Sequence, residues 1–327
     1  MKNNVFYFTR LLSQDLKKKG RNGTARSYIC AVNRLVRFLN KYELTFEEIT
    51  PSLLKNFEQH LLSDGKARNT VSMYMRMLRS ICNQAIDQHI VSLPANLFKD
   101  VFTGGDSAQK RAVSTKLIMK LGTVDTTHSR SLTFTQDMFL LSFYLRGIPF
   151  VDLAHLRKTD INMGVLRYRR SKTNKELTVV LENCALDIFK KYEKYVTRSP
   201  YLLPIIERPG HDEYQQYQSA LRLYNKNLEI FSDHLKLKTR LTSYVPRHSW
   251  ATAAYRQGIP VSIISEALGH SSEEVTYHYL ASFDDKTLRN ANRKVLSLIG
   301  KKGRQPTRSQ QKIKLPRRKY QIITDDE

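Results

Sequence analysis

The chain has 327 residues, which is enough for two domains that each bury a core of their own. Its 54 lysines and arginines outnumber 30 aspartates and glutamates, so the formal net charge is +24, and nucleic acid is a better expected partner than a membrane surface. Charges interrupt every long apolar run, which excludes a membrane span. Cys30, Cys82 and Cys184 have neither disulfide nor zinc spacing, so we expect a cytoplasmic protein.

Residues 1–102 are predicted to form a small helical domain. Apolar residues recur with helical spacing in four stretches: over 5–16, after a cap at Thr24, from Pro51 onward, and over 70–89. Glycines separate the first helix from the second and the third from the fourth. Four amphipathic helices of this length are enough to enclose one core.

The faces of these helices that do not fit the apolar pattern are basic. Such charges are often only a solvated surface, and that interpretation stays open on composition alone. If the protein acts on nucleic acid, these charges are better explained as contacts to DNA phosphates. The candidate DNA-binding residues are Arg26, Arg34, Arg68, Arg76 and Arg79.

The chain then changes character. Residues 103–111 are polar and contain two glycines, which is typical of a flexible linker. Residues 112–160 are predicted to be mostly helical, and residues 164–181 alternate apolar and polar around Thr173-Asn174, which predicts a β-hairpin.

Residues 244–280 carry the strongest functional signal. Pro246 suits the first turn of a helix that Gly258 ends, which places Arg247 at a helix N-terminus. A second helix ends at Gly269, and a capping box beginning at Ser271 predicts a third helix that continues through Tyr279. His270 then lies on the turn between the last two helices.

An arginine, a histidine and a phenol gathered in this way suit phosphodiester chemistry without a metal. The arginine holds the charge of the phosphate, the histidine donates or carries a proton, and the tyrosine attacks phosphorus. The histidines of the chain lack compact ligand spacing, so no metal site is predicted.

Here the sequence resembles the tyrosine recombinase (phage integrase) family. Arg247-His248-Ser249, Leu268-Gly269-His270 and Tyr279 match the C-terminal signature of the family in type, order and spacing. Tyr277 is not expected to be the nucleophile, because on a helix its side chain would point away from that of Tyr279. The candidate catalytic residues are Tyr279, Arg247, His270, Lys172, Arg146 and Tyr244. The first three belong to the matched signature, and the other three are discussed below.

The resemblance implies a mainly α fold. An N-terminal four-helix core-binding (SAM-like) domain would be followed, over residues 112–300, by an α+β catalytic domain of the DNA breaking-rejoining type with a small β-sheet. It also implies a site-specific recombinase that cuts and rejoins double-stranded DNA through a 3′-phosphotyrosyl link and a Holliday junction, as a homotetramer. One phosphodiester replaces another, so no cofactor and no small-molecule substrate is expected.

The first catalytic arginine of the family departs from its usual place. When Asp152-Leu153 is matched to the acidic-Leu pair of the family, Pro149 stands where the arginine belongs. Arg146, one helical turn upstream, is the preferred substitute because its long side chain could reach the same phosphate. The alternatives are Arg157, Arg169 and Arg170.

Two other positions follow from the resemblance. Lys172, beside the hairpin turn, matches the lysine that protonates the departing 5′ oxygen, with Lys175 as the alternative. Tyr244 stands where most of the family has a histidine, and we expect it to contact phosphate. His248 and Trp250 could support the site or belong to the core.

The chain starts directly at the core-binding domain, so the expected type is a conjugative-transposon or invertase-like recombinase without an arm-binding domain. Residues 284–300 predict a helix, and residues 301–327 a basic tail that we expect to be disordered. Two rival functions remain: a type IB topoisomerase-like relaxing enzyme, and a catalytically impaired DNA-binding accessory factor. The sequence does not distinguish integration, excision and inversion.

Overall fold

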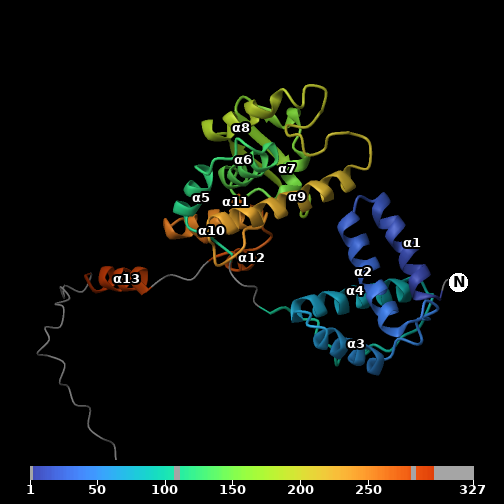
Figure 1. Ribbon diagram of the computed structural model, residues 1–327. Helices are drawn as coiled ribbons and strands as arrows, with labels where there is room; N and C mark the ends of the chain where they lie inside the picture. Colours follow the sequence, from blue (N-terminus) through green and yellow to red (C-terminus); the bar gives the residue numbers. More distant parts are fainter. Residues whose placement is uncertain (1–2, 107–110, 281–284, 298–327) are drawn as a thin grey trace, which may run out of the picture.

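The computed structural model describes residues 3–106, 111–280 and 285–297. These residues form two helical halves, and the second half contains one small sheet (Figure 1). The predicted fold class is therefore confirmed. Among the described residues, no helix is both long and apolar enough to cross a membrane.

The core-binding half consists of four helices that enclose one apolar core, as the helical spacing predicted. Leu35, Phe57 and Ile81 are fully buried at its centre. The fourth helix ends earlier than predicted because His89 takes a left-handed conformation, φ 55°, that turns the chain out of the helix. The helices are α1 (Val5–Lys18), α2 (Asn22–Leu39), α3 (Pro51–Ser63) and α4 (Arg68–Asp87).

Two other helix starts can be compared with the sequence. Pro51 opens α3 as predicted, and the side chain of Thr50 caps it by accepting a hydrogen bond from the amide of Leu53 at 3.2 Å. Helix α2 begins at Asn22, so the predicted cap Thr24 lies inside the helix. Its N-cap, Arg21, makes no side-chain capping bond.

The second half packs its helices around a larger apolar core that includes Phe139, Leu166 and Leu228. A smaller cluster joins α10, α11 and the chain around Tyr279 and Leu280. The elements are α5 (Thr115–Gly122), α6 (Arg130–Tyr144), α7 (Phe150–His155), η1 (Lys158–Asp160), α8 (Asn183–Glu193), α9 (Glu213–His234), α10 (Val245–Arg256), α11 (Val261–Leu268), α12 (Glu273–Tyr277) and α13 (Asp285–Ser297).

The predicted hairpin is confirmed as β2 (Val165–Arg169) and β3 (Glu176–Val180), which pair antiparallel with Tyr168 opposite Leu177. A short strand that the sequence did not predict, β1 (Ile161–Asn162), pairs with the outer side of β2. Because side chains alternate along β2, its buried face leads towards Arg170 and its other face is exposed.

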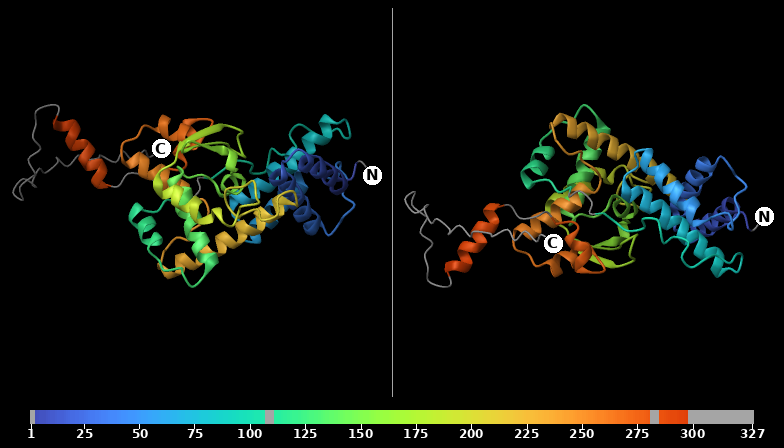
Figure 2. Two further views of the ribbon diagram at one scale, coloured as in Figure 1. Left: turned by 90° about the horizontal axis from the view of Figure 1, so that it is seen from above. Right: turned by 90° about the horizontal axis from the view of Figure 1, so that it is seen from below.

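The two halves approach each other at α2 and α9, where Arg26 donates a hydrogen bond to Gln218 at 2.5 Å (Figure 1). Helix α13 confirms the helix predicted over 284–300 within the described residues, and it lies apart from both halves (Figure 2). The predicted tail, 301–327, and part of the predicted linker, 107–110, lie outside the described residues.

Candidate active site

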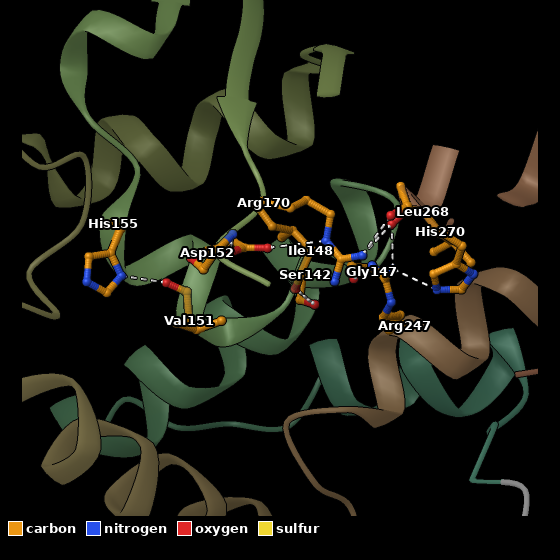
Figure 3. Close-up of polar contacts among 12 residues, drawn as sticks. Ser142, Gly147, Ile148, Val151, Asp152, His155, Arg170, Arg247, Leu268 and His270 are labelled. Carbon is orange, nitrogen blue, oxygen red and sulfur yellow. Dashed lines mark hydrogen bonds and ion pairs between the residues drawn. The ribbon is translucent and has the colours of Figure 1, made fainter. Parts of the chain in front are cut away.

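Arg247 lies at the centre of the candidate active site. It is the third residue of α10, whose first turn contains Pro246, and its side chain is buried. Its guanidinium donates hydrogen bonds to the carbonyls of Gly147 at 2.9 Å and Leu268 at 2.5 Å, and to His270 Nε2 at 3.0 Å (Figure 3). Its Nε is buried and has no hydrogen-bond partner among the described residues. A buried cation with an unused donor is suited to hold an anion.

The turn after α6 shapes one wall of this site. Gly147 adopts φ +74°, and a Cβ built there would lie 2.5 Å from the Cα of Arg247, so only glycine allows the close approach. Ser142 holds the turn, because its hydroxyl donates to the carbonyl of Ile148 at 2.7 Å and its own carbonyl accepts the amide of Gly147 at 2.7 Å. The carbonyl of Gly147 is thereby presented to the arginine.

His270 follows Gly269, whose left-handed conformation (φ 65°) ends α11 as predicted. Its Nδ1 shares a 2.8 Å hydrogen bond with the hydroxyl of Thr276, and its Nε2 accepts from Arg247. Burial, and then the charges of Arg247 and Arg170, lower the pKa of His270 to about 3. The imidazole is therefore neutral near pH 7, with its lone pair on Nε2.

Tyr279 lies against these groups within the same chain. Its ring is stacked on His248, with centroids 4.5 Å apart and planes at 26°, and it meets His270 at 4.8 Å. The guanidinium of Arg247 lies 5.6 Å from the ring centroid. Tyr277 is 54% exposed, so it lies outside this group. The structure thus brings together the three residues that the sequence signature named.

The helix before Tyr279 is shorter than predicted. The sequence predicted a capping box that begins at Ser271 and a helix that includes Tyr279. Helix α12 instead begins after Ser272, whose side chain makes no capping hydrogen bond, and ends at Tyr277. The amide of Tyr279 bonds to the carbonyl of Thr276 at 2.9 Å, a tight turn that places the tyrosine after the helix.

Arg170 is a second buried cation beside Arg247. Its guanidinium donates to the carbonyl of Leu268, which Arg247 also contacts, at 3.1 Å. Its Nε lies 3.7 Å from a carboxylate oxygen of Asp152, whose other oxygen accepts the amide of Ser171 at 2.9 Å. Arg170 therefore pairs with a buried carboxylate, and it shares with Arg247 the carbonyl of Leu268.

The other arginines that the sequence left open have different partners. They are Arg146, half-buried, which donates to the carbonyl of Thr178 at 3.4 Å; Arg157, whose guanidinium lies 5.5 Å from the ring of Tyr201; and Arg169, exposed and paired with Glu176 at 3.2 Å. Of the four candidates, Arg170 shares a hydrogen-bond acceptor with Arg247.

Lys172 and Lys175 flank the exposed turn of the hairpin. Both lie near enough to His270 for their charges to contribute to its lowered pKa, with Lys172 the larger of the two. The turn is fixed at its base, because the amide of Arg170 donates to the carbonyl of Lys175 at 2.9 Å. Both ammonium groups therefore belong to the surroundings of His270.

Tyr244, the N-cap of α10, lies at the mouth of the site and is 41% exposed. Burial and the neighbouring Tyr279 raise its pKa, so its phenol stays protonated and can donate a hydrogen bond. Its ring lies 6.4 Å from that of His248. Trp250 packs into the apolar cluster beneath the site, together with Tyr279.

Thr276 and Asp152 were not named as site residues from the sequence. Thr276 is fully buried and shares a hydrogen bond with Nδ1 of His270, while Asp152 pairs with Arg170. A signal existed for the threonine: it stands one helical turn before Tyr279 and six residues after His270. Asp152 was matched to the acidic-Leu pair of the family, but the sequence did not indicate that it pairs with Arg170, which lies 18 residues further along the chain.

The candidate DNA-binding arginines differ in how they are engaged. Arg76 and Arg26 are exposed, and Arg26 bonds across the two halves to Gln218. The remaining three have partners in their own half: Arg34 with Asp64, Arg68 with the ring of Phe102 at 4.3 Å, and Arg79 with the carbonyl of Phe98 at 3.1 Å.

Family models match both halves of the chain. Residues 4–99 match the phage integrase SAM-like domain, and residues 119–286 match the phage integrase family. The chain is 25% identical over 288 residues to tyrosine recombinase XerC of Thermodesulfovibrio yellowstonii, covering 85% of this chain and 92% of that protein. It is 24% identical over 261 residues to tyrosine recombinase XerA of Pyrococcus furiosus, covering 69% and 88%.

Solved structures show the same fold. A lambda integrase tetramer bound to a Holliday junction superposes with a TM-score of 0.61 at 15% identity, covering 86% of this chain and 80% of that one. XerH recombinase in a post-cleavage complex with palindromic difH also gives 0.61, at 17% identity, covering 86% and 83%. With the site geometry and the two family matches, these similarities identify the chain as a tyrosine recombinase that belongs to the phage integrase family.

Proposed function

We propose that the protein cuts and rejoins double-stranded DNA at specific sites through a 3′-phosphotyrosyl intermediate. The observation that carries this proposal is the contact of the Tyr279 ring with Arg247 and His270 inside one chain. A nucleophile, a buried cation and a neutral imidazole thus meet at one point, as strand transfer without a cofactor requires.

In the proposed reaction the hydroxyl of Tyr279 attacks phosphorus and loses its proton. The bond between phosphorus and the 5′ oxygen breaks, and the departing oxygen takes a proton from Lys172, with Lys175 as the alternative donor. One phosphodiester becomes another, so the bond energy is kept for rejoining by a 5′ hydroxyl.

The charge of the phosphate would be held by two arginines. Arg247 is one, and we favour Arg170 over Arg146 as the other, because Arg170 is buried, adjacent and fixed by Asp152. Arg146 stays a candidate, since a modest turn of its long side chain could bring it to the same oxygens. Tyr244 would donate to a phosphate oxygen at the mouth of the site.

His270 is proposed to accept the proton of Tyr279. Burial, and then the charge of Arg247 that engages the Nε2 lone pair, keep the pKa of His270 low. A phosphate held by Arg247 adds negative charge beside the imidazole and weakens that contact, which raises the pKa of His270 towards its ordinary value. The histidine would then become an effective proton carrier only when DNA is bound.

The core-binding half is proposed to grip the opposite side of the duplex through Arg26, Arg34, Arg68, Arg76 and Arg79. A homotetramer that passes through a Holliday junction is proposed by analogy with the lambda integrase tetramer bound to such a junction. Residues 1–102, 103–111 and 112–300 are the proposed domains and linker, and the cytoplasm is the proposed site of action.

A nicked suicide substrate tests this function. Cleavage near the nick releases a short oligonucleotide, so the wild-type protein accumulates as a covalent adduct, and Tyr279→Phe does not. An adduct that persists in Tyr279→Phe would overturn the assignment of the nucleophile, and no adduct with any core site would favour the accessory factor. Plasmids with two sites separate a recombinase, which inverts or deletes DNA, from a relaxing enzyme.

A further inference from the structure

His248 is the residue of the site to which neither the proposed chemistry nor the sequence signature gives a task. It follows Arg247 on α10, so its side chain leaves the helix about 100° away from the arginine and reaches the nucleophile instead. Its ring stacks on Tyr279 at 4.5 Å and 26°, while His270 meets the same ring at 4.8 Å. The ring of the nucleophile therefore contacts two imidazoles.

The backbone of Tyr279 is held from the same helix. The hydroxyl of Thr252 donates to the carbonyl of Tyr279 at 3.2 Å, and the His248 ring also hydrogen-bonds the backbone of that residue. The Nδ1 of His248 is buried without a partner among the described residues, which leaves Nε2 as the donor. Helix α10 thus supplies the phosphate-binding arginine and two contacts to the tyrosine.

Local structure gives the nucleophile little support of its own. Helix α12 has five residues, its N-cap Ser272 makes no side-chain hydrogen bond, and Tyr279 comes after the helix has ended. A helix this short does not fix the residues that follow it. The position of Tyr279 must therefore depend on contacts with α10 and with His270.

We propose that His248 is a positioning residue that holds Tyr279 against Arg247 of its own chain, so that the phenol is aligned for attack. The role rests on the proposed function. It concerns the alignment of the nucleophile only, because His248 does not touch the groups that hold the leaving oxygen. A histidine that merely supports the fold would affect all steps of the reaction equally.

The test separates cleavage from rejoining. Cleavage of the nicked suicide substrate requires Tyr279, whereas ligation of a strand with a 3′-p-nitrophenyl phosphate does not: a 5′ hydroxyl attacks phosphorus and p-nitrophenolate leaves. His248→Phe keeps a flat ring and loses the hydrogen bond, and His248→Ala loses both. We expect cleavage to fall about tenfold in His248→Phe and about 100-fold in His248→Ala, with ligation within about twofold of wild type.

His278→Phe is the matched control, since His278 is exposed beside the same tyrosine and its replacement should leave both rates unchanged. Unchanged cleavage in His248→Ala, or an equal loss of ligation and cleavage, would overturn the proposal. Thermal unfolding of each variant identifies a misfolded preparation independently, so an equal loss in a variant that unfolds like the wild type counts against the proposal. A wild-type protein that ligates but never forms an adduct would instead refute the proposed function.

Discussion

The two halves of the molecule keep different kinds of side chain in their interiors. The core-binding half is centred on apolar residues such as Leu35 and Phe57, and most of its candidate DNA-binding arginines lie at the surface. The catalytic half buries Arg247 and Arg170, and the buried carboxylate of Asp152 pairs with Arg170. The buried carboxylate of the first half, Glu58, has an ammonium and a backbone amide as partners, whereas the second half buries Arg247 with no carboxylate partner among the described residues. The second half accepts that cost in order to hold a reactive arrangement.

The largest effect is expected from Arg247→Ala. Removing the central cation should lower both cleavage and ligation at least about 10³-fold, because each passes through a phosphorus centre of increased negative charge. Single-turnover rates on the two substrates described above measure this. A variant that keeps more than a tenth of wild-type ligation would show that the buried charge is structural.

Leu35→Ala is expected to have the opposite effect, a loss of stability without a loss of activity. Truncating this fully buried side chain should lower the free energy of unfolding by about 2–5 kcal/mol, measured by denaturant titration. Ligation per folded molecule should stay unchanged at temperatures well below the transition, since the catalytic half has a separate core. A selective loss of ligation would mean that the halves are coupled more tightly than their interiors indicate.

The same ligation assay compares how much Arg170 and Arg146 each contribute to the rate. Arg170→Ala is expected to lower the rate about 100-fold, and Arg146→Ala by about tenfold or less, because only the former shares the Leu268 carbonyl with Arg247. Arg170→Lys should recover little, since an ammonium cannot reproduce the forked contacts of a guanidinium. The reverse order would give the role of the first arginine to Arg146.

A pH effect on stability follows from His270. The unfolded imidazole takes up a proton near pH 6.5 and the folded one near pH 3, so between these values the unfolded chain binds more protons. Stability should therefore fall as pH decreases from 6.5, by on the order of 2 kcal/mol at pH 4.5. In His270→Asn this part of the slope should disappear; an identical slope would place the pH effect elsewhere.

The smallest effect is expected at the surface of the core-binding half. Arg76→Ala should weaken DNA binding a few-fold and reduce the slope of log K against log salt by about 1, measured by fluorescence anisotropy. Arg34→Ala should change the slope less, because Arg34 is already paired with Asp64. Equal slopes for both variants and wild type would remove these arginines from the DNA interface.

The sequence predicted those parts of the structure that depend on neighbours in the chain. Helical spacing placed α1 to α4, strand alternation placed the hairpin, and Arg247, His270 and Tyr279 were named from their separations. It could not rank Arg170 above Arg146, since the decisive contact joins residues 98 positions apart. It also extended α12 through Tyr279, because a capping pattern does not register the turn that Thr276 closes.

The two buried guanidinium groups, of which Arg170 pairs with Asp152, have a consequence for how the protein behaves before it meets its substrate. Arg247 has no carboxylate partner in the part of the chain that the structure describes, and its buried Nε, which makes no hydrogen bond there, marks where an anion would bind. A multivalent oxyanion of modest size, such as sulfate or vanadate, meets that need as a phosphodiester does. We therefore expect such anions in a storage buffer to compete with DNA for this site, so buffer composition should be matched before two preparations are compared.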